Sequence, residues 1–238
     1  MSDAFKRIDD RSNAQYEQNK TSNKQEAKGY PVDLTFVIDT TGSMSDKIEG
    51  LLKTCARFID EFAALELDGQ IGLVAFGDLR VPGDKIQPFE FTADMEITKQ
   101  RLKNIPRFGG GGNEGESSLE ALDSAIKLNY RPNAVKVIVL ITDEPAHTTG
   151  QITIENISGR FAKQEFLVFV VSPLHEYFMD FAHKNGGRWY KISAETDFTN
   201  ALEIFRQVAK RIVRVASDVH RLAGGSVSTY LQLTAPKR

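Results

Sequence analysis

Short, almost wholly apolar runs alternate along this chain with segments in which apolar residues recur every three or four positions. Apolar runs that are rich in β-branched and aromatic residues and bounded by polar turns are typical of strands buried on both faces. They comprise residues 32–39, 70–76, 135–141, 166–171 and 189–192. A shorter alternating run, residues 89–91, follows Pro88 and suits an edge strand, because proline cannot donate a ladder hydrogen bond.

The segments between these runs have the three-and-four spacing of amphipathic helices. The first helical stripe consists of Ile48, Leu51, Leu52, Cys55, Phe58, Ile59 and Phe62. Because Cys55 lies in this stripe, we interpret it as a core residue rather than a nucleophile. Ser43 or Ser45 is expected to cap this helix. Near the end of the chain, residues 226–233 alternate between polar and apolar, and we expect an added strand there, in this sheet or in a neighbour's.

Strands that alternate with helices predict an α/β fold with a doubly wound, mostly parallel central sheet, helices on both faces and one antiparallel edge strand. No segment between residues 31 and 216 has the composition of a linker. We therefore expect a polar N-terminal arm over residues 1–30, disordered or loosely helical, one domain over residues 31–216, and a C-terminal tail over residues 217–238.

Composition narrows the classes of function. The net charge of −2 in 238 residues gives no bulk electrostatic case for nucleic acid or an anionic membrane. The single cysteine excludes an internal disulfide and a cysteine-based metal cluster. The first residues contain no apolar core of a signal peptide, and no run approaches a membrane span. A soluble, cytoplasmic protein is the expectation.

The candidate chemistry begins where the first buried strand ends. Asp39, Thr41 and Ser43 are spaced by two, so an extended turn directs all three side-chain oxygens the same way. Asp143 follows the strongest predicted strand and supplies a second carboxylate at the same sheet edge. Two carboxylates and two hydroxyls suit a hard divalent cation, Mg²⁺ first, with Mn²⁺ or Ca²⁺ as alternatives, and leave a coordination position for an outside oxygen.

Each of these features also has a plainer interpretation. The stretch from Asp39 to Ser43 contains residues that favour turns and helix caps. The four glycines at positions 109–112 resemble a phosphate-binding loop but lack the Gly-Lys-Ser/Thr sequence. His147 lies near the expected site and is a candidate for tuning it, whereas the other three histidines show no ligand spacing.

The three sequences FVIDTTGSMS, GGGGNEGES and VLITDEPAH resemble, in order, the metal-ion-dependent adhesion site of von Willebrand factor A domains. The resemblance covers roughly residues 31–215 and implies that Asp39, Thr41, Ser43 and Asp143 are metal ligands. Many family members place a threonine ligand in the middle loop. The sequence of this chain is closer to the Gly-Gly-Gly-Asp-x-x-Glu loop of intracellular members. Asn113 is the candidate fifth ligand, with Glu116 behind it as a supporting or helix-capping group.

The resemblance implies a non-enzymatic module that binds an acidic residue of a partner protein through the cation. Intracellular members commonly act with AAA+ ATPases, which would here be a separate polypeptide, because this chain carries no ATPase sequence. Two alternatives remain open. One is a scaffold with a degenerate metal site. The other is a Mg²⁺-dependent phosphohydrolase with Asp39 as nucleophile, although position 41 is threonine and offers no general acid.

Overall fold

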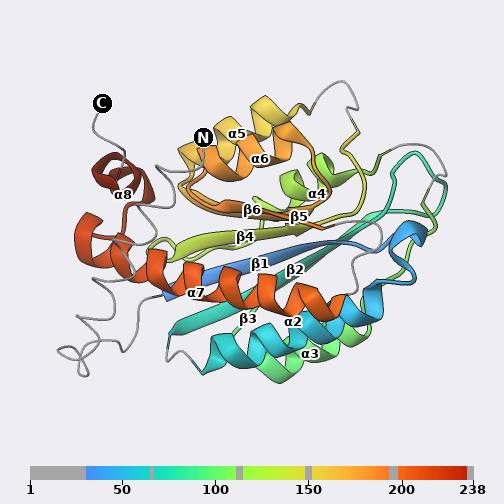
Figure 1. The fold of residues 1–238 in the computed structure, drawn as a ribbon, viewed down its shortest axis with the longest axis horizontal. Helices are drawn as coiled ribbons and strands as arrows, with labels where there is room; N and C mark the ends of the chain where they lie inside the picture. Colours follow the sequence, from blue (N-terminus) through green and yellow to red (C-terminus); the bar gives the residue numbers. More distant parts are fainter. Residues whose placement is uncertain (1–30, 65–66, 111–114, 148–151, 193–197, 235–238) are drawn as a thin grey trace.

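A six-stranded sheet forms the centre of the molecule, with the strand order β3-β2-β1-β4-β5-β6 (Figure 1). The computed structural model describes residues 31–64, 67–110, 115–147, 152–192 and 198–234. The parallel strands are β1 (Pro31–Asp39), β2 (Asp68–Phe76), β4 (Val135–Ile141), β5 (Phe166–Ser172) and β6 (Arg188–Lys191). The edge strand β3 (Ile86–Thr92) pairs antiparallel with β2. The predicted α/β architecture with one antiparallel edge strand is confirmed.

Helices cover both faces of the sheet. Figure 1 shows α2 (Ile48–Ala63), α3 (Met95–Lys103) and α7 (Phe198–Ala223) on one face, and α4 (Ser118–Ala125), α5 (Ile154–Lys163) and α6 (Glu176–Lys184) on the other. The boundary expected at residue 216 falls inside α7, which continues to Ala223. The expected arm over residues 1–30 lies outside the described residues.

The central strand explains why the apolar runs are continuous rather than alternating. Leu34, Phe36 and Ile38 of β1 belong to the hydrophobic cluster beneath α2 and α7. Val37 of the same strand belongs to the cluster beneath α4, α5 and α6. Each face therefore has its own core, so successive residues of a central strand are buried and most of them are apolar. Cys55 is fully buried in the first cluster, as expected for a core residue, and burial raises the pKa of its thiol.

The start of α2 differs from the prediction. A 3₁₀ turn, η1 (Gly42–Met44), follows β1, and α2 begins only at Ile48 with Lys47 at the N-cap position. Neither Ser43 nor Ser45 caps the helix, and the Lys47 side chain makes no capping hydrogen bond. The Ser43 hydroxyl is instead directed at a carboxylate across the sheet edge. The residue that resembled a cap is thus part of the candidate site.

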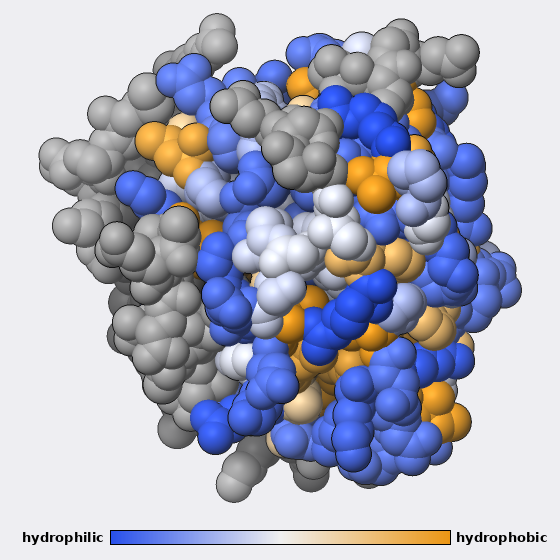
Figure 2. All heavy atoms as spheres, turned by 90° about the vertical axis from the view of Figure 1, so that its right-hand side faces the viewer, coloured by the Kyte–Doolittle hydropathy of each residue, from blue (hydrophilic) through white to orange (hydrophobic). Residues whose placement is uncertain are grey.

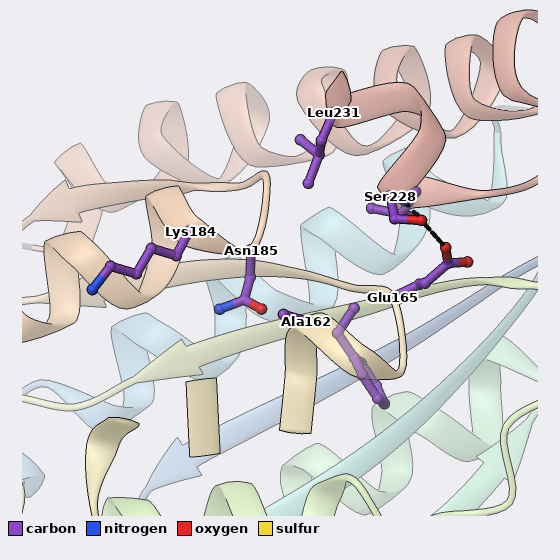
Figure 3. A pocket seen from close by; sticks show the side chains of 8 residues that line it. Ala162, Glu165, Lys184, Asn185, Ser228 and Leu231 are labelled. Carbon is purple, nitrogen blue, oxygen red and sulfur yellow. Dashed lines mark hydrogen bonds between the residues drawn. The ribbon is translucent and has the colours of Figure 1, made fainter. Parts of the chain in front are cut away.

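The expected strand at residues 226–233 is wrong, because this segment forms the helix α8 (Val227–Thr234). The Glu165 carboxylate accepts hydrogen bonds from the Ser226 hydroxyl at 2.7 Å and from the Ser228 backbone N–H at 3.2 Å. Figure 3 shows Glu165 facing Ser228, and both residues line a cavity together with Leu231. An acidic group at a helix N-terminus satisfies exposed N–H groups, so a distant residue sets this local structure.

A network of charged and aromatic groups closes the amino edge of the sheet. Asp33 of β1 is fully buried, and Arg131 binds its carboxylate through the backbone N–H at 2.6 Å and Nε at 2.8 Å. The same guanidinium reaches Asp68 of β2 at 2.8 Å. Beside it, the Tyr130 hydroxyl lies 2.7 Å from the Thr35 hydroxyl. These bonds attach the segment before β4 to the starts of β1 and β2.

Candidate metal site at the carboxyl edge of the sheet

Asp39, the last residue of β1, lies at the opposite edge and is held by several hydrogen bonds. Its side chain is fully buried. Oδ1 accepts hydrogen bonds from the Thr41 N–H at 3.0 Å and the Thr41 hydroxyl at 2.6 Å. Oδ2 accepts a hydrogen bond from the Thr142 hydroxyl at 2.7 Å. Burial nevertheless raises the pKa of Asp39 to about 6, outweighing these hydrogen bonds, which lower it.

The hydrogen bonds continue from Thr41 across the edge to β4. The hydroxyls of Thr41 and Ser43 lie 3.1 Å apart, and the Ser43 hydroxyl donates to Asp143 Oδ1 at 2.9 Å. We call the side chains of Asp39, Thr41, Ser43 and Asp143 the oxygen network. The Thr41 and Ser43 hydroxyls each lie at donating distance from a carboxylate. If both protons are directed there, the lone pairs of both oxygens remain available to a cation.

Backbone hydrogen bonds hold the middle loop against the first loop. The Phe108 N–H donates to Thr40 O at 2.9 Å, and the Gly42 N–H donates to Gly109 O at 3.2 Å. A Cβ atom added at Gly42 would lie 2.6 Å from Gly109 O, closer than real Cβ contacts allow. Glycine at position 42 therefore permits the close approach of the two loops.

The carboxylate of Asp84 organises the same middle loop. It accepts the Gly109 N–H at 2.9 Å and the Gly110 N–H at 3.0 Å, one on each oxygen. Gly110 has φ of 72°, in the left-handed region that favours glycine. Asp84, in the turn between β2 and β3, therefore fixes the path of the first two glycines of this loop.

The middle loop also contacts the last loop. The Glu116 N–H donates to Pro145 O at 2.8 Å, and the His147 N–H donates to Glu116 O at 2.9 Å, which forms a short parallel bridge. Glu116 is 4% exposed, and its Oε2 has no hydrogen-bond partner within the described part of the chain. Burial raises the pKa of Glu116 to about 8, with further contributions from Asp39 and Asp78.

His147 lies at this edge but its ring faces a different set of groups. The ring contacts the Arg80 guanidinium, and its Nε2 lies 3.4 Å from Oδ1 of the buried Asp78. Burial and the Arg80 charge lower the pKa of His147. We interpret His147 as part of an Asp78–Arg80–His147 cluster that braces the loop after β2.

One basic group reaches the oxygen network directly. The Lys47 ammonium lies 2.7 Å from Asp143 Oδ2, and the two side chains are 17% and 7% exposed. Asp143 therefore bonds the Ser43 hydroxyl with one oxygen and the Lys47 ammonium with the other. The roles of Lys47, Thr142 and Asp84 were not predicted from the sequence, because their partners lie far away along the chain.

The donor set fits a hard divalent cation in chemistry and arrangement. Carboxylate and hydroxyl oxygens are the ligands that Mg²⁺ and Ca²⁺ prefer. The buried Asp39 carboxylate has a raised pKa, which means that it lacks compensating positive charge. Among the described residues no group of three or more His, Cys, Asp or Glu side chains forms a metal site. The oxygen network has only two such side chains, and its remaining oxygens come from hydroxyls.

The structure thus brings together Asp39, Thr41, Ser43 and Asp143, as the sequence predicted. Their role as metal ligands stays a prediction. Asn113, the fifth candidate, lies outside the described residues. Figure 2 faces this edge and shows weakly polar residues near its middle among hydrophilic ones, with scattered hydrophobic residues.

Fold and edge together define a class, the α/β domains with an oxygen-rich polar edge at the carboxyl ends of parallel strands. The family model of the von Willebrand factor type A domain matches residues 33–209, and the chain belongs to this family. Domains of this family are generally protein-interaction modules and are often metal-dependent. Within the described residues, no helix is long and apolar enough to cross a membrane.

The chain is also similar to the alpha-protein kinase vwkA of Dictyostelium discoideum, with 30% identity over 121 residues. The match covers 50% of this chain and 19% of the kinase. Because the match spans so little of that protein, the kinase activity in its name is not transferred to this chain.

Proposed function

We propose that this protein is a metal-dependent protein-interaction module and not an enzyme. In this proposal the oxygen network holds a divalent cation, Mg²⁺ or alternatively Mn²⁺ or Ca²⁺. The bound cation offers an open coordination position to an acidic side chain of a partner protein. The supporting observation is the continuous line of hydrogen bonds from Asp39 through Thr41 and Ser43 to Asp143, which gathers hard oxygen donors at one edge.

The chain's own residues have separate tasks in this proposal. Thr142 and the Thr41 N–H hold the Asp39 carboxylate in place from opposite sides. The exposed Ser43 lies at the surface of the site, where a partner's carboxylate approaches. Asp84, in the loop after β2, holds the middle loop through the Gly109 and Gly110 N–H groups.

The residue at position 41 supports binding over catalysis. A nucleophilic Asp39 would need a general acid beside it, and Thr41 carries only a hydroxyl. We propose a cytoplasmic partner, with a separate AAA+ ATPase as one candidate, and neither nucleic acid nor a membrane.

An affinity pull-down from the native cell lysate tests the proposal. Ser43→Ala removes one donor at an exposed position and should leave the domain folded, and Ser45→Ala, also exposed and in the same turn, is the matched control. We expect a partner that is captured by the wild type and Ser45→Ala in Mg²⁺, but not in EDTA or by Ser43→Ala. A partner retained in all samples would contradict the metal bridge and favour a scaffold with a degenerate site. Turnover of an aryl phosphate would contradict the non-enzymatic assignment.

A further inference from the structure

Lys47 is the only lysine or arginine bonded to the oxygen network within the described part of the chain. It binds the oxygen of Asp143 that faces away from Ser43, at 2.7 Å. Both side chains are largely buried, with 17% and 7% exposure, so solvent screens this pair weakly. The contact is therefore part of the site's electrostatics and not a loose surface pair.

The backbone fixes Lys47 in this position. Its N–H donates to Met44 O at 2.9 Å, and its carbonyl accepts the Leu51 N–H at 3.0 Å at the start of α2. Met44 itself is fully buried in the core. The turn that carries Ser43 and the helix that begins after Lys47 therefore hold the ammonium beside Asp143.

The charge of Lys47 changes what the site offers to a cation. The two carboxylates of the oxygen network carry a formal charge of −2 when ionised, and the Lys47 ammonium reduces the sum to −1. A divalent cation that approaches Asp143 is repelled by this ammonium. After the cation binds, the two carboxylates, the Lys47 ammonium and the cation together carry a formal charge of +1, which suits an anionic group of a partner.

We propose that Lys47 is a built-in counter-ion of Asp143 that lowers the site's affinity for a divalent cation. It thereby sets the cation concentration at which the site is loaded. This inference rests on the proposed function, because it concerns the same cation site. An alternative is that Lys47 only anchors the start of α2, and the two roles predict different responses to Mg²⁺.

Calorimetric titration of the full chain with Mg²⁺ distinguishes the counter-ion role of Lys47 from the anchoring role. Lys47→Gln removes the charge and keeps a hydrogen-bond donor, Lys47→Met removes both, and Lys47→Arg keeps the charge as the matched control. A unit charge about 6 Å from a divalent cation changes the affinity for that cation by about tenfold even at the dielectric constant of bulk water. We expect Gln and Met variants to bind Mg²⁺ more tightly by that factor, and the Arg variant to remain within about twofold of the wild type.

Thermal unfolding gives a second readout that an anchoring role would not produce. In EDTA the Gln variant should unfold a few degrees below the wild type, since Asp143 loses its ion pair. In saturating Mg²⁺ this difference should shrink or reverse. An equal deficit in EDTA and Mg²⁺ would overturn the inference in favour of simple anchoring.

The outcomes also separate this inference from the proposed function. Wild-type binding of Mg²⁺ with unchanged or weaker binding by the Gln and Met variants overturns the counter-ion role alone. Mg²⁺ binding by none of the proteins, wild type included, overturns both the counter-ion role and the metal-dependent module.

Discussion

Asp33 and Asp39 are both fully buried on β1, six positions apart, yet they are stabilised by different groups. Asp33 lies against the guanidinium of Arg131. The hydrogen bonds to Asp39 come from the hydroxyls of Thr41 and Thr142 and one backbone N–H. Burial raises the pKa of Asp39 to about 6 in spite of them. Among the residues that the structure describes, the buried Asp39 carboxylate lacks a positively charged partner, and a bound cation would stabilise its ionised form.

Thr142→Val tests the support that β4 gives to Asp39. The substitution keeps the shape of the side chain and removes the 2.7 Å hydrogen bond to Asp39 Oδ2. Because that bond lowers the pKa of Asp39, its loss raises the pKa further and disfavours the carboxylate that a cation needs. We expect Mg²⁺ affinity at pH 7 to fall about tenfold and the free energy of unfolding in EDTA to fall by about 1–2 kcal/mol. Calorimetric titration and urea unfolding measure the two effects.

Thr40→Val is the matched control, because Thr40 is also a buried threonine but donates only a long 3.4 Å hydrogen bond to Phe76 O. Its Mg²⁺ affinity should stay within about twofold of the wild type. Equal affinities in Thr142→Val and the wild type would show that Asp39 needs no support from β4.

The grouping of the site residues at one edge was predictable where a local rule applies, and their role as metal ligands stays a prediction. The spacing by two after a buried strand identifies Asp39, Thr41 and Ser43, and a strand end identifies Asp143. The roles of Lys47 and Thr142 are recognised only from their contacts with Asp143 and Asp39 in the structure, because these partners are about a hundred residues away along the chain. Thr142 offered a weak signal as the residue before Asp143, and Lys47 offered none.

At the scale of elements, the ion pairs of Arg131 with Asp33 and Asp68 stabilise the packing of its segment against the starts of β1 and β2. Arg131→Met removes a guanidinium from the buried Asp33 carboxylate and leaves that charge without its counter-ion. Breaking a buried ion pair from one side costs about 3–5 kcal/mol. Because Arg131 is 32% exposed, we expect a loss of about 3 kcal/mol in the free energy of unfolding, measured with urea.

Arg221→Met is the control, since Arg221 pairs with Asp218 on the surface of α7 and is 54% exposed. It should change stability by less than about 0.5 kcal/mol. Adding Asp33→Asn to Arg131→Met should recover part of the loss, because the unpaired charge is then gone. If Arg131→Met were as stable as Arg221→Met, the stabilising role of the Arg131 ion pairs would be contradicted.

Element type was predictable where a long apolar pattern determines it. The buried strands and the stripe of α2 follow from periodicity, and both are confirmed. Periodicity failed for residues 226–233, where eight alternating residues fit a strand but Glu165 caps a helix. It also missed the 3₁₀ turn before α2, because the Ser43 hydroxyl bonds Asp143 instead of capping. In both cases a contact from a remote element overrides the local preference.

At the scale of the whole molecule, the two edges of the sheet differ in how their buried carboxylates are stabilised. The amino edge pairs its buried carboxylate with an arginine. The carboxyl edge gathers several buried acids: Asp39, Asp78 and Glu116 have at most 4% exposure. Burial and neighbouring carboxylates raise the pKa of Asp39 to about 6 and that of Glu116 to about 8. An edge that is strained by negative charge is stabilised by whatever cation it binds.

This edge gives the molecule a distinctive dependence of stability on pH. The pKa of Glu116 is 4.5 in the unfolded chain and about 8 in the folded protein, so the unfolded chain ionises first. The contribution of Glu116 to the free energy of unfolding therefore falls as pH rises from about 4.5 and levels off above about 8. Glu116→Gln removes this loss. In EDTA we expect the variant to match the wild type near pH 4.5 and to exceed it by roughly 3 kcal/mol at pH 9.

Urea unfolding at a series of pH values measures the difference in the free energy of unfolding between the variant and the wild type. Glu49→Gln, at an exposed position of α2, is the control, and its difference from the wild type should not vary with pH. The comparison with the variant is essential, because other carboxyls change stability with the opposite sign. Asp123 and Glu165 have lowered pKa values, so their contribution to the free energy of unfolding is lost as pH falls. A Glu116→Gln advantage that is already complete at pH 4.5 would place its cause in packing rather than in charge. An advantage that grows through the range up to pH 8 would locate the strain at the carboxyl edge, where the cation is proposed to bind.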